Sequence, residues 1–373
     1  MKSPLFKVGF FFFMGHYNFK LINFVGMNVD YLIVGCGLAG IAFCEQLRAH
    51  NKTFVVFDNE SQQSSKVAAG VYNPVILKRF TEVWMAKEQL DLAIPKYEVI
   101  GKLLQEQVDF PIPVYRRFTS VEEQNLWFSA SDKLTLEPFL STTLVKNSNE
   151  EIKAPFGFGE VLHTGRVDTT VLIDGYRSYL AKEGRLVSEA FNHDAIRIEA
   201  NSIQYLEYTA KRVVFCEGFG VKSNPYFNYL PLNGTKGETI TIKAPKLNLK
   251  TILKGAVFIL PLGDDVYIVG ATYNWKDKSN KPSLEGREEL VGKVKELINC
   301  DFTVIGQEAG IRPTVKDRRP LVGTHPEHAN MYILNGLGTR GVMIAPYVAE
   351  QLFECIEHTT PLNPEIDIKR FSF

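Results

Sequence analysis

The sequence has few of the residues that build disulfide frameworks or metal sites. Its 373 residues include only five cysteines, with no C-x-x-C pair, and seven histidines, of which only His325 and His328 lie close together. A zinc helix or a disulfide scaffold is therefore not indicated, and isolated cysteines in apolar contexts are typical of a reducing compartment. We expect a cytoplasmic protein without a metal.

The sequence also has no excess of positive or negative charge and no long apolar run. Forty-two basic residues balance forty-two acidic ones, so the composition does not favour a nucleic-acid or membrane partner. Lysines gather locally at Lys243, Lys246, Lys250 and Lys254, which we interpret as a solvated face between strands. The apolar run "GFFFFMG" at 9–15 is too short to cross a bilayer. Composition does not indicate an oligomeric state.

The first 26 residues differ in character from the rest of the sequence. They contain the short aromatic run, but no small-residue cleavage site of the kind that ends a signal peptide. Met27 directly precedes "NVDYLIVG", where a compact domain would begin. We predict that residues 1–26 are an N-terminal extension, with Met27 as an alternative start.

The remaining sequence begins with a βαβ pattern. A continuous apolar run at 30–35, helical spacing at 38–50 and a second apolar run at 52–58 predict two buried parallel strands joined by a helix. Further helices are predicted at 82–106, 167–184, 283–298 and 341–357, and alternation at 236–272 predicts antiparallel strands. The predicted fold class is α/β, with a Rossmann-like nucleotide-binding domain (27–95, 155–225 and 305–373) and an inserted α+β substrate domain (96–154 and 226–304) carrying an antiparallel sheet.

A glycine motif lies between the first strand and the first helix. "GCGLAG" matches G-x-G-x-x-G, in which the glycines permit a tight turn, close approach to a pyrophosphate and close helix–strand packing. Asp58 ends the next strand, where a carboxylate can accept hydrogen bonds from a ribose. An ordinary glycine-rich turn is the alternative, but the ordered context favours a bound adenine dinucleotide. The predicted contacts here are Gly35, Gly37, Leu38, Ala39, Gly40 and Asp58.

The segment after Asp58 bears on whether the dinucleotide is NAD or FAD. The catalytic His–Asp or Lys constellation of a nicotinamide dehydrogenase is missing from the rest of the sequence. Instead, "SSKVAAGVYNP" at 64–74 supplies serines, small residues and a glycine that would let the backbone pass close to a diphosphate and a flat ring. This favours FAD, with contacts from Asn59, Ser64, Ser65, Ala69 and Gly70.

The order of these motifs resembles the D-amino-acid oxidase superfamily of FAD enzymes, of the glycine oxidase and sarcosine oxidase kind. The resemblance runs from about residue 28 to 373 through "VDYLIVGCGLAG", "SSKVAAG", "VVFCEGFG", "GIRPTVKDRRPLVG" and "LNGLGTRGVMIAP". It implies that the second glycine turn lies under the isoalloxazine ring of FAD. The absence of histidine and cysteine from "GLGTRG" implies noncovalent binding. The contacts that the resemblance implies are Gly218, Gly338, Thr339, Arg340, Gly341 and Val342.

The same resemblance assigns substrate residues. Arg312 of "GIRP" occupies the position that grips the substrate carboxylate, and its alternative role is a structural ion pair with Glu308 or Asp317. Tyr273 of "GATYNW" and Tyr72 are further candidates for the substrate pocket. Either tyrosine has packing within the fold as its alternative role.

The implied activity is oxidation of the C–N bond of a small carboxylate-bearing amine or amino acid by hydride transfer to FAD, followed by hydrolysis of the imine. The sequence at 337–352, "LGTRGVMIAPYVAEQL", also resembles the flavin half of the bifunctional tRNA wobble-uridine enzyme. Action on carboxymethylaminomethyl-uridine of tRNA is therefore an alternative, although neutral charge does not favour it. The motifs are also compatible with a dehydrogenase that passes electrons to a quinone or partner protein, and with an FAD-binding protein without activity.

Overall fold

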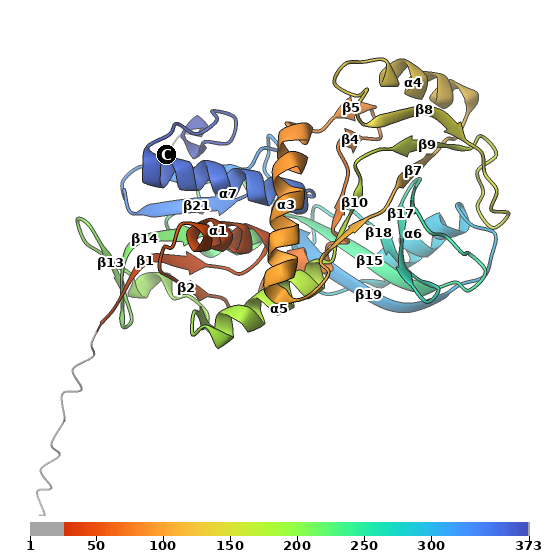
Figure 1. The fold of residues 1–373 in the computed structure, drawn as a ribbon. Helices are drawn as coiled ribbons and strands as arrows, with labels where there is room; N and C mark the ends of the chain where they lie inside the picture. Colours follow the sequence, from red (N-terminus) through yellow and green to blue (C-terminus); the bar gives the residue numbers. More distant parts are fainter. Residues whose placement is uncertain (1–25, 372–373) are drawn as a thin grey trace, which may run out of the picture.

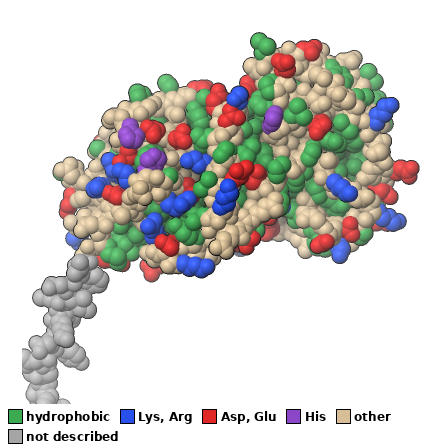
Figure 2. Space-filling view, viewed as in Figure 1, with side chains coloured by type: hydrophobic (Ala, Val, Ile, Leu, Met, Phe, Trp, Pro, Cys, Tyr) green, Lys and Arg blue, Asp and Glu red, His purple; other side chains and the backbone are tan. Residues whose placement is uncertain are grey.

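The computed structural model describes residues 26–371, so the predicted extension at 1–26 lies almost wholly outside the described residues. The chain forms two halves, each built around its own sheet, and helix α3 (Ala86–Leu104) runs between them (Figure 1). Acidic and basic side chains are interspersed over the face shown in Figure 2, as the balanced composition suggests.

The first half contains the predicted nucleotide-binding sheet. Its central strands are parallel because β1 pairs with β2 and β14, and β14 pairs with β21. Residues Tyr31–Val34 are buried, as the apolar run predicts. The strand order is β11 (Leu186–Val187), β2 (Phe54–Phe57), β1 (Met27–Val34), β14 (Tyr208–Phe215), β13 (Ile203–Tyr205) and β12 (Arg197–Ile198), with β21 (Met331–Asn335) on β14 and β20 (Leu321–Thr324) on β21.

Helices cover this sheet, and α1, α5 and α7 begin within two residues of the predicted positions, whereas α2 was not predicted. Helix α5 begins after Asp168, whose side chain accepts a hydrogen bond from the Val171 backbone N–H, and Gly184 at φ 66° follows its end. Tyr97 of α3 donates a 2.8 Å hydrogen bond to the Val342 carbonyl and so fixes the start of α7. The helices here are α1 (Leu38–Ala49), α2 (Ser64–Val67), α5 (Thr169–Lys182) and α7 (Gly341–His358), with short 3₁₀ turns η1 (His193–Ala195), η2 (Gly218–Ser223) and η3 (Ile368–Arg370).

The second half contains the antiparallel sheet that alternation at 236–272 predicts, with one parallel pair, β16 with β7. Its order is β19 (Thr303–Arg312), β15 (Thr235–Lys243), β18 (Val266–Gly270), β17 (Phe258–Gly263), β16 (Ile252–Lys254), β7 (Val114–Arg117), β9 (Phe158–Val161) and β8 (Leu140–Val145). Helices α4 (Val121–Ser131) and α6 (Leu284–Lys295) belong to this half (Figure 1). Smaller sheets pair β3 (Val71–Tyr72) and β6 (Asp109–Pro111) with β10 (Gly165–Val167), and β4 (Val75–Ile76) with β5 (Thr81–Glu82).

The sheets divide the chain differently from the predicted boundaries. The boundary at 95/96 falls inside α3, a single helix that packs against α7 of the nucleotide-binding half. The boundaries at 154/155 and 304/305 assign β9 and most of β19 to the nucleotide-binding domain, whereas both strands pair in the antiparallel sheet. Local patterning predicts the helix at 82–106 but not the sheet to which β9 and β19 belong, because each strand depends on a partner that is distant in the sequence.

Candidate active site

A cavity of about 570 Å³ is lined by residues from both halves of the chain. Its walls come from the carboxyl ends of β1, β2 and β14, from both glycine turns, and from β15, β16, β17 and β19 of the antiparallel sheet. Ligands of open α/β folds bind at the carboxyl ends of parallel strands. The antiparallel sheet encloses the same space from the other side.

The first glycine turn has the geometry that a pyrophosphate requires. A Cβ atom on Gly40 would stand 2.0 Å from the Gly35 carbonyl oxygen, so only glycine permits this helix–strand contact. Gly35 takes φ 103°, in the region that favours glycine. At Gly37 a Cβ would meet only the Ser65 side chain, with the hydroxyl at 3.1 Å, and would otherwise project toward the cavity. The N-terminus of α1 therefore faces open space suited to an anion.

The second glycine turn lies beside the first. A Cβ on Gly341 would stand 2.9 Å from Leu38 Cδ1, so the N-termini of α7 and α1 meet at one cavity. The Gly338 backbone N–H donates a 3.1 Å hydrogen bond to the Pro313 carbonyl, which ties this turn to "GIRP". Asn335 bridges the turn to the segment after β14, because its side chain donates to the Gly218 carbonyl and accepts from the Gly336 N–H.

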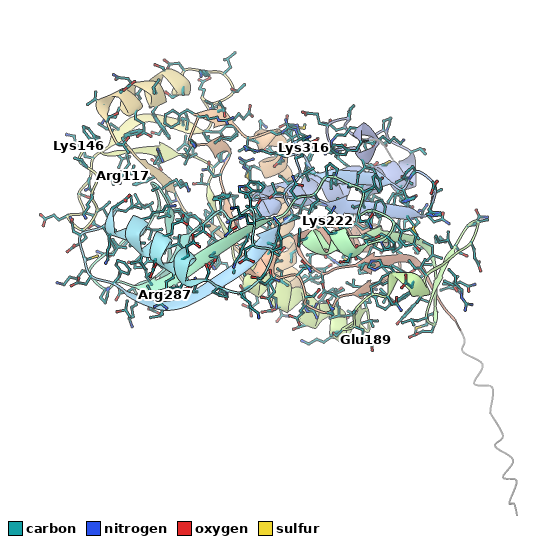
Figure 3. The ribbon with its side chains drawn as sticks, turned by 180° about the vertical axis from the view of Figure 1, so that it is seen from behind. Arg117, Lys146, Glu189, Lys222, Arg287 and Lys316 are labelled. Carbon is teal, nitrogen blue, oxygen red and sulfur yellow. The ribbon has the colours of Figure 1, made fainter. Side chains whose placement is uncertain are left out.

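Asp58 lies at the nucleotide end of the cavity and is already well bonded. Its carboxylate accepts a 2.6 Å hydrogen bond from the Cys36 backbone N–H and forms an ion pair with Arg177. His193 and Glu217 also line this end and bond to each other at 2.8 Å, a contact that sequence reasoning missed because 24 residues separate them. Glu189 is a third acid here, and Figure 3 places it with the nucleotide-binding half.

The opposite end of the cavity contains cations instead. Arg312 lies against Gly237, donates a 3.2 Å hydrogen bond to the Thr272 carbonyl and stacks its guanidinium 4.5 Å from the centre of the Tyr273 ring. Burial lowers the pKa of both Arg312 and Arg340. Among residues 26–371 neither guanidinium has a carboxylate partner. Both charges are partly desolvated and lack an acidic partner among the described residues, which is typical of an anion-binding site.

The predicted alternative for Arg312, a structural ion pair, has no support in the described part of the chain. Asp317 binds Arg370 at 2.8 Å, and Glu308 lies on the edge strand β19 without an ion pair to Arg312.

The first predicted substrate tyrosine, Tyr273, lines the cavity, although 62% of its surface is exposed.

The second tyrosine, Tyr72, is not part of the cavity lining. It is buried with its hydroxyl bonded to Asp109, and its ring packs against Gly165, where a Cβ would approach the hydroxyl to 2.1 Å. Tyr72 therefore has a packing role in the structure. This is the alternative that the sequence left open for it.

The structure brings most of the other predicted residues together. Gly40 does not line the cavity and serves the helix–strand contact instead. The predicted residues that line the cavity are Gly35, Gly37, Leu38, Ala39, Asp58, Asn59, Ser64, Ser65, Ala69, Gly70, Gly218, Tyr273, Arg312, Gly338, Thr339, Arg340, Gly341 and Val342. No cluster of metal-ligating side chains occurs within residues 26–371.

The fold and the cavity define a dinucleotide-dependent enzyme of the flavoprotein type. The features that define it are a Rossmann-like sheet, two helix N-termini at one cavity and a second domain that closes over this cavity. Residues 30–354 match the family described as DAO, FAD dependent oxidoreductase, and the chain belongs to this family. Its cofactor is FAD. In the part of the chain that the structure describes, no helix has the length and apolar character of a membrane span.

Comparison with individual proteins agrees with this family. The chain is 26% identical to a glycine oxidase of Bacillus subtilis (strain 168), over 91% of this chain and 95% of that protein. It is 26% identical to the tRNA 5-methylaminomethyl-2-thiouridine biosynthesis bifunctional protein MnmC of Nitrosospira multiformis, over 70% of this chain but only 42% of that protein. A crystal structure of glycine oxidase from Geobacillus kaustophilus superposes with a TM-score of 0.74 at 20% identity, covering 93% of this chain and 98% of the other.

Proposed function

We propose that the protein oxidises the C–N bond of a small amine that carries a carboxylate. The observation that supports this most directly is Arg312, a desolvated guanidinium without an acidic partner among the described residues, which lines the cavity beside Tyr273. A planar guanidinium recognises a carboxylate through two parallel hydrogen bonds. Similarity to a glycine oxidase along nearly the whole chain points to the same substrate class.

The residues divide the binding work between the two ends of the cavity. The N-terminus of α1, with Gly37 and Ser65, would hold the pyrophosphate of FAD, and Asp58 would accept hydrogen bonds from the ribose. The N-terminus of α7 and Arg340 place positive charge at the other end. This charge would stabilise negative charge on a reduced flavin.

When bound, FAD supplies the acceptor for a hydride from the carbon next to the amine. Arg312 holds the carboxylate on that carbon and so orients its C–H bond. The nitrogen lone pair becomes the second bond of an imine as the hydride leaves, and water then converts the imine to a carbonyl compound and an amine. The step requires the amine to be neutral but requires no strong protein base.

A panel of amines tests this proposal. Purified protein should be reduced under anaerobic conditions by glycine, sarcosine or a D-amino acid, with bleaching of the flavin absorbance. Peroxide formation with oxygen as sole acceptor would identify an oxidase, whereas reduction without peroxide would identify a dehydrogenase that uses a quinone or partner protein. If no carboxylate-bearing amine reduces the flavin, the proposal is wrong.

Exposed aromatic residues near the cavity favour modified tRNA as a second candidate substrate. Tyr273 and Trp275 are 62% and 55% exposed, and exposed aromatic rings can stack on unpaired bases. The basic residues labelled in Figure 3 are, however, spread over both halves and do not form one stripe. Including carboxymethylaminomethyl-uridine tRNA in the anaerobic panel separates this candidate from free amino acids.

A further inference from the structure

Lys254 is a cation in the cavity whose role the proposed function does not explain. The sequence interpretation places it on a solvated face with other lysines, and the structure corrects this. It lies at the end of β16, is partly buried and lines the cavity, with its ammonium nitrogen 5.6 Å from the centre of the Phe258 ring. Burial, with Arg116 and Lys293 nearby, lowers its pKa to about 8.

The two cations near Lys254 have acidic partners of their own. Glu123 accepts a 2.6 Å hydrogen bond from Arg116, and Glu289 pairs with Lys293 at 2.5 Å. Among residues 26–371 the Lys254 ammonium has no carboxylate or hydrogen-bond partner. Lys236, which is almost completely buried, contrasts with it because Lys236 binds Asp277 at 2.6 Å and also lies 3.4 Å from Glu238. The fold therefore compensates its buried lysine and leaves the lysine in the cavity available to a ligand.

Strand register places Lys254 over the same face of the sheet as Arg312. Thr239, Gly270, Phe258 and Lys254 stand in one row across β15, β18, β17 and β16. The Phe258 ring covers Gly270, since a Cβ there would stand 2.6 Å from the ring. Lys254 lies over this ring.

Arg312 lies over the same face of the sheet. Its guanidinium covers Gly237, two residues from Thr239 on β15, and both of these residues line the cavity. The strands that carry Gly237 and Phe258 are two positions apart, or about 10 Å. The two cations thus lie over one face of the sheet and line the same cavity.

We propose that Lys254 binds a second acidic group of the substrate, so that the preferred substrate is a small amine with two carboxylates, one held by Arg312 and the other by Lys254. This rests on the proposed function. Arg312 covers Gly237 of β15, and Lys254 covers the Phe258 ring of β17, two strands away. An amine with two carboxylates, extended by a hydrogen bond at each end, has a length comparable to this separation of about 10 Å. An amine with a single carboxylate would leave the ammonium desolvated and unpaired, which is unfavourable.

The test compares iminodiacetate with sarcosine as reductants of the bound flavin. We expect the unaltered protein to prefer iminodiacetate in kcat/KM, and Lys254→Met to lower the ratio of the two values by about 10- to 150-fold, the usual effect of losing one charge-assisted hydrogen bond. Lys254→Arg keeps the charge and should keep most of the preference. Lys250→Met, which removes an exposed lysine four residues away, is the matched control and should leave the ratio unchanged.

Three results would overturn the proposal. An unaltered protein without preference, or a Lys254→Met variant with the same ratio as the unaltered protein, would exclude a second carboxylate site. Loss of the preference in Lys254→Arg as well would show that a positive charge at this position does not set the preference. If no amine reduces the flavin, the proposed function fails but the site remains testable, because malonate should perturb the flavin spectrum at lower concentration than acetate, and Lys254→Met should remove this difference.

Discussion

Replacing Arg312 by lysine is the sharpest test of the substrate site. Lysine keeps the positive charge but loses the planar fork that binds both carboxylate oxygens. Losing one charge-assisted hydrogen bond costs about 1.5–3 kcal/mol, which corresponds to an about 10- to 150-fold lower kcat/KM for flavin reduction by a carboxylate-bearing amine. An amine without a carboxylate should be equally poor with both proteins.

The structure also predicts that this variant remains folded. Arg312 contributes one hydrogen bond to Thr272 and a stacking contact with Tyr273, but no ion pair with any described residue. These contacts are worth little against the cost of burying an uncompensated charge, so the free energy of unfolding should change by no more than about 1 kcal/mol. Stopped-flow reduction under anaerobic conditions measures the first effect, and thermal unfolding with bound FAD measures the second.

A matched control and a contrary result complete the test. Arg287 of α6 is exposed, forms no ion pair with the described residues and lies outside the cavity, so Arg287→Lys should change neither quantity (Figure 3). An Arg312→Lys protein that unfolds more easily yet still discriminates for the carboxylate would remove Arg312 from the active site and assign it a structural role.

The site supports four more tests. FAD should be released by acid precipitation, because "GLGTRG" offers no residue for a covalent bond; flavin that stays with the pellet would contradict this. Gly37→Val should fold but lose FAD, because its Cβ meets only the Ser65 side chain in the protein; unchanged flavin content would show that the pyrophosphate lies elsewhere. Asn335→Ala should lower the free energy of unfolding by about 1–3 kcal/mol, because the Gly218 carbonyl and the Gly336 N–H lose their hydrogen-bond partner. An unchanged midpoint in chemical denaturation would refute this. The preference for iminodiacetate should fall as pH rises through about 8, because burial, Arg116 and Lys293 lower the pKa of Lys254 to about 8 and its ammonium group loses its proton there. A ratio of the two kcat/KM values that stays constant from pH 7 to 9 would contradict this.

Local patterns in the sequence were enough to predict the main elements and the cofactor. The apolar run at 30–35, the glycines that follow it and Asp58 specify a strand, a turn and a helix through neighbouring residues alone, and the structure has each of them. The Asp168 cap and the alternation at 236–272 are likewise local patterns, and they too are confirmed. The order of the motifs along the chain indicated FAD, which the family match confirms.

Which elements share a sheet, and which side chains share the cavity, depends instead on contacts between distant parts of the chain. Strand β7 pairs with β16, which lies far along the sequence, and β19 joins the antiparallel sheet across the predicted boundary, because strand pairing depends on partners that periodicity does not identify. Lys254 looks like any surface lysine in a local window, and Tyr72 looks like a cavity residue. The fold turns Lys254 into the cavity and buries Tyr72 against Gly165, because the direction of each side chain is set by its strand register against distant partners.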